Sequence, residues 1–258
     1  MDLDAGLGFG PGGRAGLRGF RWFGIRFRFA GDRWSYRLHW VAPGAEWALD
    51  SLMMPHRCWN ESYASGELPW DTGEPEPLLV EFITAGRVRP TQTLEIGAGT
   101  GTNALWLAER GFDVLGIDVA PLAVERATAK LNGRALRCRF AALDFLAGTP
   151  EGGPFSFIFD RGCFHVFDEP EERARFAAQV AAAIAPGGIW LSMIGSTEGP
   201  QREVGPPRRS AREVTLAIEP ALEIVELRSA EFRGHGAPAW FCLSRKRAIP
   251  AQPSTRHE

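Results

Sequence analysis

Three glycines and a carboxylate that follow a short apolar run are the residues best placed to do chemistry. Residues 94–103 read Leu-Glu-Ile-Gly-Ala-Gly-Thr-Gly-Thr-Asn, so the glycines have the spacing G-x-G-x-G and Glu95 stands two residues before the first of them. Glycines in such a turn let a ligand approach the backbone, and a helix that follows presents free N–H groups. The sequence therefore predicts a ligand-binding turn at the end of a strand.

The details of this turn indicate the kind of ligand. The dinucleotide pattern G-x-G-x-x-G/A requires Gly or Ala where this chain has Thr102. The carboxylate of Glu95 would repel a pyrophosphate and attract an ammonium group. We therefore interpret the turn as a site for a cationic nucleoside that bears an amino acid, rather than for a dinucleotide.

A second acidic residue stands where a ribose ligand is expected. Residues 112–117 have the pattern of a buried parallel strand, and they end at Asp118, 19 residues beyond Gly99. In doubly wound folds an acid at the end of the second strand binds ribose hydroxyls. A strand, a glycine turn, a helix, a second strand and a terminal acid together are much more specific than the glycines alone.

Taken with three later motifs, these features resemble the class I S-adenosylmethionine-dependent methyltransferases over roughly residues 56–247. The later motifs are Ala-Leu-Asp-Phe at 142–145, Asp-Arg-Gly at 160–162 and Pro-Gly-Gly at 186–188. The resemblance implies an α/β fold with a doubly wound, mostly parallel seven-stranded sheet whose last strand is antiparallel, and S-adenosylmethionine as cofactor. It also implies that the cofactor contacts Trp59, Trp70, Glu95, Gly97, Gly99, Thr100, Gly101, Asn103, Asp118, Val119, Asp144, Phe145 and Asp160.

Two further segments resemble a narrower group within that class. The pattern from Trp59 through Tyr63 and Pro69-Trp70-Asp71 to Pro77 is similar to the N-terminal segment of the thiopurine, thiol and halide methyltransferases, where it folds over the cofactor. Residues 160–165 are similar to a motif of bacterial small-molecule methyltransferases, tellurite-resistance enzymes included. The resemblance implies methyl transfer to a thiol or similar soft acceptor. A phenol or quinol O-methyltransferase is the alternative, followed by an RNA methyltransferase or a non-catalytic cofactor-binding protein.

Two residues just past the predicted strand 155–159 are the candidate catalytic groups. His165 is placed to act as a general base, although it also has the pattern of a residue that packs the loop. Arg161 is placed to meet an anionic acceptor or to pair with Asp160. Trp59 and Trp70 have two interpretations as well, as core aromatics or as rings that cover the sulfonium. Methyl transfer from a sulfonium requires alignment of the reacting atoms, so we expect no metal.

Composition limits the class of protein. The chain has 258 residues, 45% of them hydrophobic and 23% charged, with a net charge of −2. That balance is typical of a globular domain and is not that of a nucleic-acid binder. The four cysteines lack metal-ligand spacing, and no apolar run approaches the ~20 residues of a membrane span. We expect a cytoplasmic, monomeric enzyme with a small-molecule acceptor and without a membrane or nucleic-acid partner.

The domain organisation follows from composition. We expect a basic, Gly/Arg/aromatic extension at 1–52 that is poorly ordered, a methyltransferase domain at 53–247 that includes the N-terminal segment 56–77, and a disordered tail at 248–258. Seven arginines between residues 14 and 37 leave three interpretations of the extension: a transit peptide, an arm for RNA or anionic lipid, and an extension without function. We favour the last, because the family-like segment begins just after Met53-Met54.

Hydrophobic periodicity predicts alternating strands and helices in this domain. The predicted strands are 93–96, 113–117, 137–141, 155–159, 189–193, 222–232 and 239–245. The predicted helices are 77–85, 121–131, 169–184 and 210–217, with one more between the glycine turn and residue 110.

Overall fold

The computed structural model describes residues 25–30, 33–38, 59–66, 68–200, 206–232 and 236–247. The chain divides into two compact units, Met1–Cys58 and Trp59–Glu258. In the first unit, β1 (Ile25–Ala30) and β2 (Arg33–Leu38) pair as antiparallel strands. We expected no regular structure here. The alternation of arginine with apolar residues has the period of two that a strand requires.

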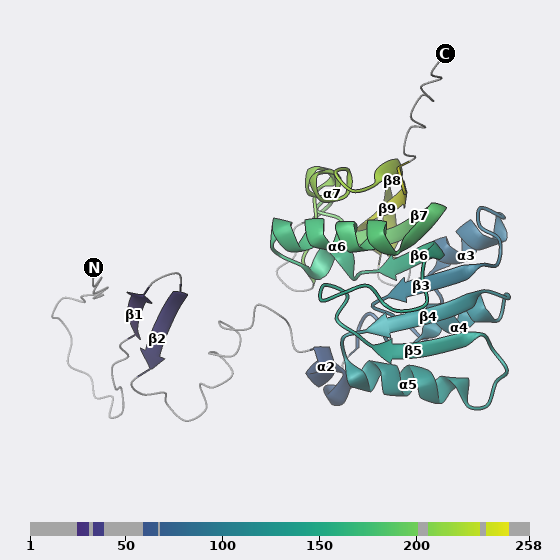
Figure 1. Ribbon diagram of the computed structural model, residues 1–258, viewed down its shortest axis with the longest axis horizontal. Coiled ribbons are helices and arrows are strands. Elements are labelled where there is room, and N and C mark those ends of the chain that lie inside the picture. The colour runs from purple at the N-terminus through teal and green to yellow at the C-terminus, as the bar shows by residue number, and fades with distance from the viewer. Residues whose placement is uncertain are drawn as a thin grey trace, which may run out of the picture. The chain divides into compact units, whose positions relative to one another are not determined.

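The second unit is built on a seven-stranded sheet with the order β5-β4-β3-β6-β7-β9-β8 (Figure 1). Strands β3 to β7 run parallel, and β9 is antiparallel to both of its neighbours. This is the predicted fold class, which is confirmed. The strands are β3 (Gln92–Ile96), β4 (Asp113–Asp118), β5 (Cys138–Ala142), β6 (Phe155–Arg161), β7 (Ile184–Gly195), β8 (Glu223–Phe232) and β9 (Ala237–Arg245).

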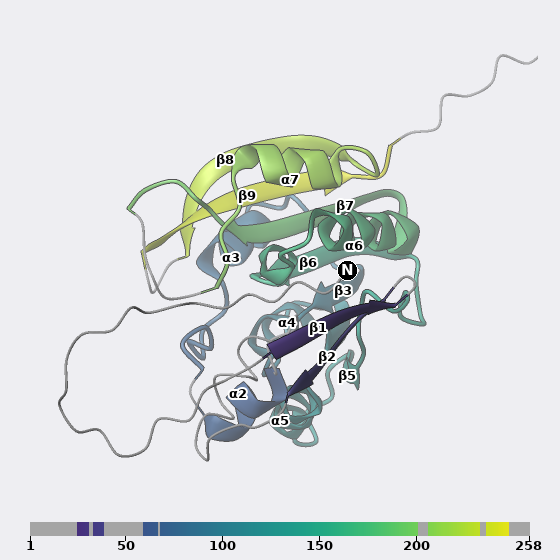
Figure 2. The same ribbon diagram turned by 90° about the vertical axis from the view of Figure 1, so that its left-hand side faces the viewer.

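Helices cover both faces of this sheet. In Figure 1, α6 and α7 lie in front of the sheet and α3 behind it, and Figure 2 shows β7, β9 and β8 as neighbouring ribbons at one edge. No helix in the described ranges is long and apolar enough to cross a membrane. The helices are α2 (Trp59–Ser65), α3 (Pro77–Thr84), α4 (Thr102–Ala108), α5 (Pro121–Leu131), the 3₁₀ turn η1 (Phe164–Val166), α6 (Pro170–Ala183) and α7 (Ala211–Ile218).

The central strand β6 shows why a parallel sheet has continuous apolar strands. Phe155 and Ile158 belong to the core beneath α6 and α7, whereas Phe157 and Phe159 belong to the core beneath α3 and α4. Both faces of β6 are buried, so both sets of side chains must be apolar. β7 begins at Ile184 rather than at the predicted residue 189, because Ile184 pairs with Phe155 before a shift in register.

The strand register brings the candidate site together. Ile96 of β3 pairs with Ile117 on one side and with Asp160 on the other. Because β3, β4 and β6 are parallel, their carboxyl ends meet at one edge of the sheet. The glycine turn, Asp118 and Arg161 therefore emerge side by side.

Candidate cofactor and acceptor site

The glycine turn is shaped by contacts that leave no room for larger residues. A Cβ on Gly101 would lie 2.6 Å from the ring of Phe140 on β5. Gly101 also caps the start of α4 with a left-handed backbone, φ 79°. A Cβ on Gly99 would lie 3.0 Å from the hydroxyl of Tyr63. Glycine at these positions thus lets α4 pack closely on the sheet and leaves the turn open toward the N-terminal segment.

Glu95 is a buried acid, and one of its two carboxylate oxygens has no hydrogen-bond partner among the described residues. Its side chain lies beneath the turn and is 1% exposed. Oε1 accepts a hydrogen bond from Asn103 Nδ2 at 3.0 Å, whereas Oε2 is buried without a partner in the described part of the chain. Burial raises the pKa of Glu95 to about 8. A buried polar atom without a partner costs ~1–3 kcal/mol, so a cationic ligand group at Oε2 would remove a penalty that the protein alone leaves in place.

Asp118 joins the end of β4 to the same turn. It accepts hydrogen bonds from the Gly99 amide at Oδ2 and from the Ala120 amide at Oδ1, both at 2.9 Å. Burial raises its pKa. Each carboxylate oxygen has a second lone pair with which to accept a ribose hydroxyl. The next residue, Val119, is an apolar side chain left 52% exposed at this edge.

The N-terminal segment, described at 59–66 and 68–77, is attached directly to this machinery. Thr100 donates a hydrogen bond to Asp71 Oδ2 at 2.7 Å. The backbone amide of Glu76 donates to Asn103 Oδ1 at 2.8 Å, while Arg161 Nε donates to Glu76 Oε2 at 2.7 Å. These bonds attach the segment to the glycine turn, to α4 and to the end of β6.

Three aromatic rings gather in this segment. Trp59 and Tyr63 both pack edge-on against Trp70, with ring centroids 5.5 Å and 6.2 Å away. Tyr63 is buried, and burial together with the nearby charge of Asp118 raises its pKa well above the ordinary value. Tyr63 belongs to the N-terminal segment predicted to fold over the cofactor, but it was not among the predicted cofactor contacts. Its spacing of four residues from Trp59, on one face of α2, was the available signal.

Arg161 has a different partner from the one expected. It pairs with Glu76, whose side chain is fully buried, and not with its neighbour Asp160. Arg161 also donates to the Trp70 carbonyl at 3.2 Å, and its guanidinium lies 4.9 Å from the ring centre of Phe232. Glu76 was missed, although its place before Pro77 marks a helix N-cap. Arg161 thus brings a positive charge to the carboxyl end of β6.

Asp160 has protein donors on both of its carboxylate oxygens. It is fully buried, Oδ1 accepts from Trp190 Nε1 at 2.9 Å, and Oδ2 accepts from the amides of Phe164 at 3.1 Å and Cys163 at 3.3 Å. Burial raises its pKa to about 6. The carboxylate holds the 3₁₀ turn η1 against β7, which is a structural role and differs from the cofactor contact expected of it.

Phe145 and Asp144, two other residues expected at the cofactor, differ in their burial. Phe145 is buried in the core, with its ring centroid 5.0 Å from that of Phe176. Asp144 is exposed, and its Oδ1 accepts the Leu146 amide at 2.9 Å, which is a local turn. The Leu143 amide donates to the Asp118 carbonyl at 2.9 Å, so this turn begins next to the ribose-binding acid. The side chain of Phe145 therefore belongs to the core, whereas Asp144 stays accessible.

His165 is buried and contacts the ends of β7 and β8. It is 3% exposed, and Nδ1 accepts the Gly195 amide at 2.5 Å. Its ring packs edge-on against Phe232, with centroids 6.1 Å apart. An imidazole nitrogen that accepts a backbone proton has its lone pair in use, so the neutral ring carries its hydrogen on Nε2. This geometry holds the end of β7 against η1, and it does not leave His165 poised as a general base.

The topology and the site define a class I S-adenosylmethionine-dependent methyltransferase. The structure is similar, with a TM-score of 0.61 and 20% identity, to the 1,6-didemethyltoxoflavin-N1-methyltransferase of Burkholderia thailandensis, a complex with S-adenosylhomocysteine; the match covers 88% of this chain and 96% of that one. The chain belongs to the thiopurine S-methyltransferase family, which matches residues 54–235. The class and the group implied by the motifs, and S-adenosylmethionine as their cofactor, are confirmed.

Two relatives show the range of this similarity. The chain is 31% identical to "Probable thiol methyltransferase 2" of Arabidopsis thaliana, over 58% of this chain and 65% of the relative. It is 32% identical to a 2-heptyl-1-hydroxyquinolin-4(1H)-one methyltransferase of Mycobacteroides abscessus, over 49% of this chain and 55% of that protein. The matches thus span less than two thirds of the length of these curated relatives.

Proposed function

We propose that this protein transfers a methyl group from S-adenosylmethionine to a small-molecule thiol or a similarly soft nucleophile. The observation that carries the proposal is Glu95, a buried carboxylate with an unpartnered oxygen directly beneath the glycine turn. Such an oxygen suits a ligand that brings an ammonium group. The G-x-G-x-G spacing and Asp118 suit the nucleoside part of the same ligand.

Each residue that would hold the cofactor would contact a different part of it. S-adenosylmethionine, when bound, supplies an activated methyl group. Glu95 pairs with the ammonium group, Asp118 accepts the ribose hydroxyls, and Trp59 and Trp70 shield the site from water and favour a cation by its attraction to their rings. Val119 offers apolar surface beside the ribose acid.

The acceptor end favours a nucleophile that ionises without help. Arg161 uses N–H donors on Glu76 and on the Trp70 carbonyl, and its remaining donors suit an anionic acceptor. Asp160 is fully buried with protein donors on both oxygens, and His165 uses Nδ1 to hold Gly195, so neither is arranged to remove a proton. A thiol with a pKa of ~8.5 supplies thiolate near neutral pH, whereas a phenol near ~10 depends more on a base. The name of the Arabidopsis relative supports the same choice.

A matched pair of acceptors tests this proposal. Thiophenol and phenol share a ring and differ in the attacking atom, and both would be incubated with radiolabelled S-adenosylmethionine and the purified full chain. We expect fast methylation of thiophenol and slow but measurable methylation of phenol. Faster methylation of phenol than of thiophenol would reject the thiol assignment in favour of the O-methyltransferase alternative.

His165→Ala adds a second test with the same acceptors. We expect both acceptors to slow by a similar factor, because a residue that positions β7 affects them alike. A selective loss with phenol, of the ~10²–10⁴-fold that general-base catalysis contributes, would instead establish His165 as the base.

A further inference from the structure

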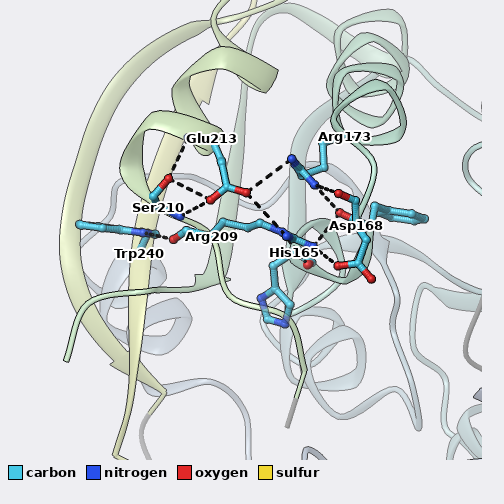
Figure 3. Close-up of polar contacts among 8 residues, drawn as sticks. His165, Asp168, Arg173, Arg209, Ser210, Glu213 and Trp240 are labelled. Carbon is cyan, nitrogen blue, oxygen red and sulfur yellow. Dashed lines mark hydrogen bonds and ion pairs between the residues drawn. The ribbon is translucent and has the colours of Figure 1, made fainter. Parts of the chain in front are cut away.

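Two buried arginines lie next to the acceptor end of the sheet (Figure 3). Arg209 and Arg173 are only 7% and 3% exposed. Both arginines pair with Glu213, and Arg209 also pairs with Asp168. Buried charges of this kind are retained only when they are paired and hydrogen-bonded. The two arginines nevertheless differ in what they connect.

Arg209 connects three separate elements. Its side chain donates to the His165 carbonyl at 3.1 Å and to the Phe167 carbonyl and Asp168 Oδ1, both at 2.8 Å. Its own amide donates to the Gly195 carbonyl at 2.7 Å. Its carbonyl accepts from Trp240 Nε1 of β9 at 2.8 Å. One residue therefore ties η1, the end of β7 and β9 together.

Arg173 is similarly buried but contacts fewer elements than Arg209. It donates to the carbonyls of Phe167 at 2.7 Å and Asp168 at 2.6 Å, and it pairs with Glu213 at 3.6 Å. These contacts hold the start of α6 to the loop after η1 and to α7. Arg173 is therefore a matched control, since it is a buried guanidinium that, unlike that of Arg209, makes no hydrogen bond to His165 among the described contacts.

The contacts of Arg209 form a closed ring around His165. The Gly195 amide donates to the His165 ring, the Gly195 carbonyl accepts from the Arg209 amide, and the Arg209 side chain donates to the His165 carbonyl. The ring of His165 packs on Phe232, which in turn lies beneath the guanidinium of Arg161. Any loosening of Arg209 is therefore transmitted to Phe232 and Arg161 at the acceptor end.

We propose that Arg209 is a positioning residue that sets the geometry of the acceptor end and has no part in holding the cofactor. This inference rests on the proposed function, because it assigns the acceptor to the side of Arg161, Phe232 and His165. The cofactor side, with Glu95 and Asp118, shares no hydrogen bond with Arg209 among the described contacts. The prediction is a loss confined to the acceptor.

The test compares Arg209→Met with Arg173→Met, since both remove a buried guanidinium that pairs with Glu213. Acceptor KM and kcat would be measured with thiophenol, and the dissociation constant of S-adenosylhomocysteine by calorimetry. For Arg209→Met we expect the acceptor KM to rise about tenfold, as for the loss of ~1.4 kcal/mol of interaction, with an unchanged dissociation constant. For Arg173→Met we expect neither constant to change, and for Arg209→Lys we expect partial recovery.

Hydrogen exchange supplies a readout that does not depend on turnover. In Arg209→Met the amides of Gly195 and Thr197, which bond to His165 and to the Arg209 carbonyl, should exchange faster than in Arg173→Met. Equal exchange and equal acceptor KM in the two variants would overturn the proposal, as would a rise in the S-adenosylhomocysteine constant that matches the rise in KM. If wild-type protein does not methylate thiophenol, the proposed function fails, while the exchange comparison still decides whether Arg209 fixes the end of β7.

Discussion

Glu95 and Asp160 are two acids on neighbouring parallel strands, and they differ in how many hydrogen bonds the protein donates to them. Glu95 pairs in register with Phe159, the residue before Asp160, and both acids are buried. Asp160 accepts hydrogen bonds from three donors of the protein, whereas Glu95 keeps an oxygen without a partner in the described part of the chain. Burial raises the pKa of both, to about 6 and about 8 respectively.

The difference distinguishes Asp160, whose hydrogen bonds stabilise the fold, from Glu95, whose unpartnered oxygen is available to a ligand. A buried carboxylate with protein donors on both oxygens stabilises the elements that donate to it. A buried carboxylate oxygen without a donor lowers the stability of the protein, and a ligand that donates to it removes this penalty. The comparison predicts that removing Asp160 harms stability, whereas removing Glu95 harms cofactor binding.

The largest effect is expected from Asp160→Ala. The substitution leaves the amides of Cys163 and Phe164 and the indole of Trp190 without an acceptor, at ~1–3 kcal/mol for each buried group. The free energy of unfolding should fall by at least ~3 kcal/mol in urea denaturation. Asp144→Asn is the control, because Asp144 is exposed and its side chain accepts only the Leu146 amide among the described hydrogen bonds. An equal, small loss in both variants would show that Asp160 is not structural.

Asp118→Ala should give the next largest effect, this time on the ligand. The ribose hydroxyls lose a charged acceptor worth ~1.5–3 kcal/mol, so the dissociation constant of S-adenosylhomocysteine should rise at least tenfold. Asp144→Ala, an exposed acid at the end of the next strand, provides the comparison and should change it less. Unchanged affinity in Asp118→Ala would remove Asp118 from the cofactor site.

Glu95→Gln should weaken the cofactor about tenfold near pH 8, because the ammonium group loses a charge partner worth roughly 1.4 kcal/mol. Because the pKa of Glu95 is about 8, the free protein holds its proton at pH 7. In wild-type protein the affinity should therefore increase as pH rises from about 6 towards 8, where the α-amino group of the ligand begins to lose its own proton, and in Glu95→Gln this increase should disappear. A pH profile shared by both proteins would assign the effect to another group.

The same pKa has a consequence for the free protein. An unfolded Glu95 ionises near the ordinary glutamate pKa of 4.5, while the folded residue keeps its proton up to about 8. The folded state thus binds more protons between these values, and its stability contribution falls as pH rises through that window. Glu95→Gln should show a smaller loss of melting temperature between pH 5 and 8 than the wild type shows.

The smallest effect is expected from removal of the extension. Both acids and the whole family match at 54–235 lie in the part of the chain that remains when it begins at Met54. Melting temperature and thiophenol turnover should be unchanged in that shortened protein. A large drop in either would revive the interpretation of residues 1–52 as a functional arm, for which the hairpin β1–β2 would be the starting point.

Most of the fold could be predicted from the sequence, because periodicity and turn residues are local. Apart from β1, β2 and the early start of β7, the strands lie where their patterns indicated, as do the helix 121–131 and the acidic start of α6. The role of each acid could not be predicted, because it depends on distant partners. Asp160 meets Trp190 30 residues away, and Arg161 meets Glu76 across 85 residues. Local motif membership gave Asp160 and Glu95 the same expected role, and only the tertiary contacts distinguish them.

The central claim is that the open oxygen of Glu95 receives the ammonium group of S-adenosylmethionine. It is tested most directly by calorimetric titration at pH 7 in two buffers of different ionisation enthalpy, with NAD as the comparison ligand. The account predicts that S-adenosylmethionine binds with release of up to one proton, that Glu95→Gln abolishes this release, and that NAD does not bind. Binding of NAD without S-adenosylmethionine, or the same proton release in Glu95→Gln, would contradict it.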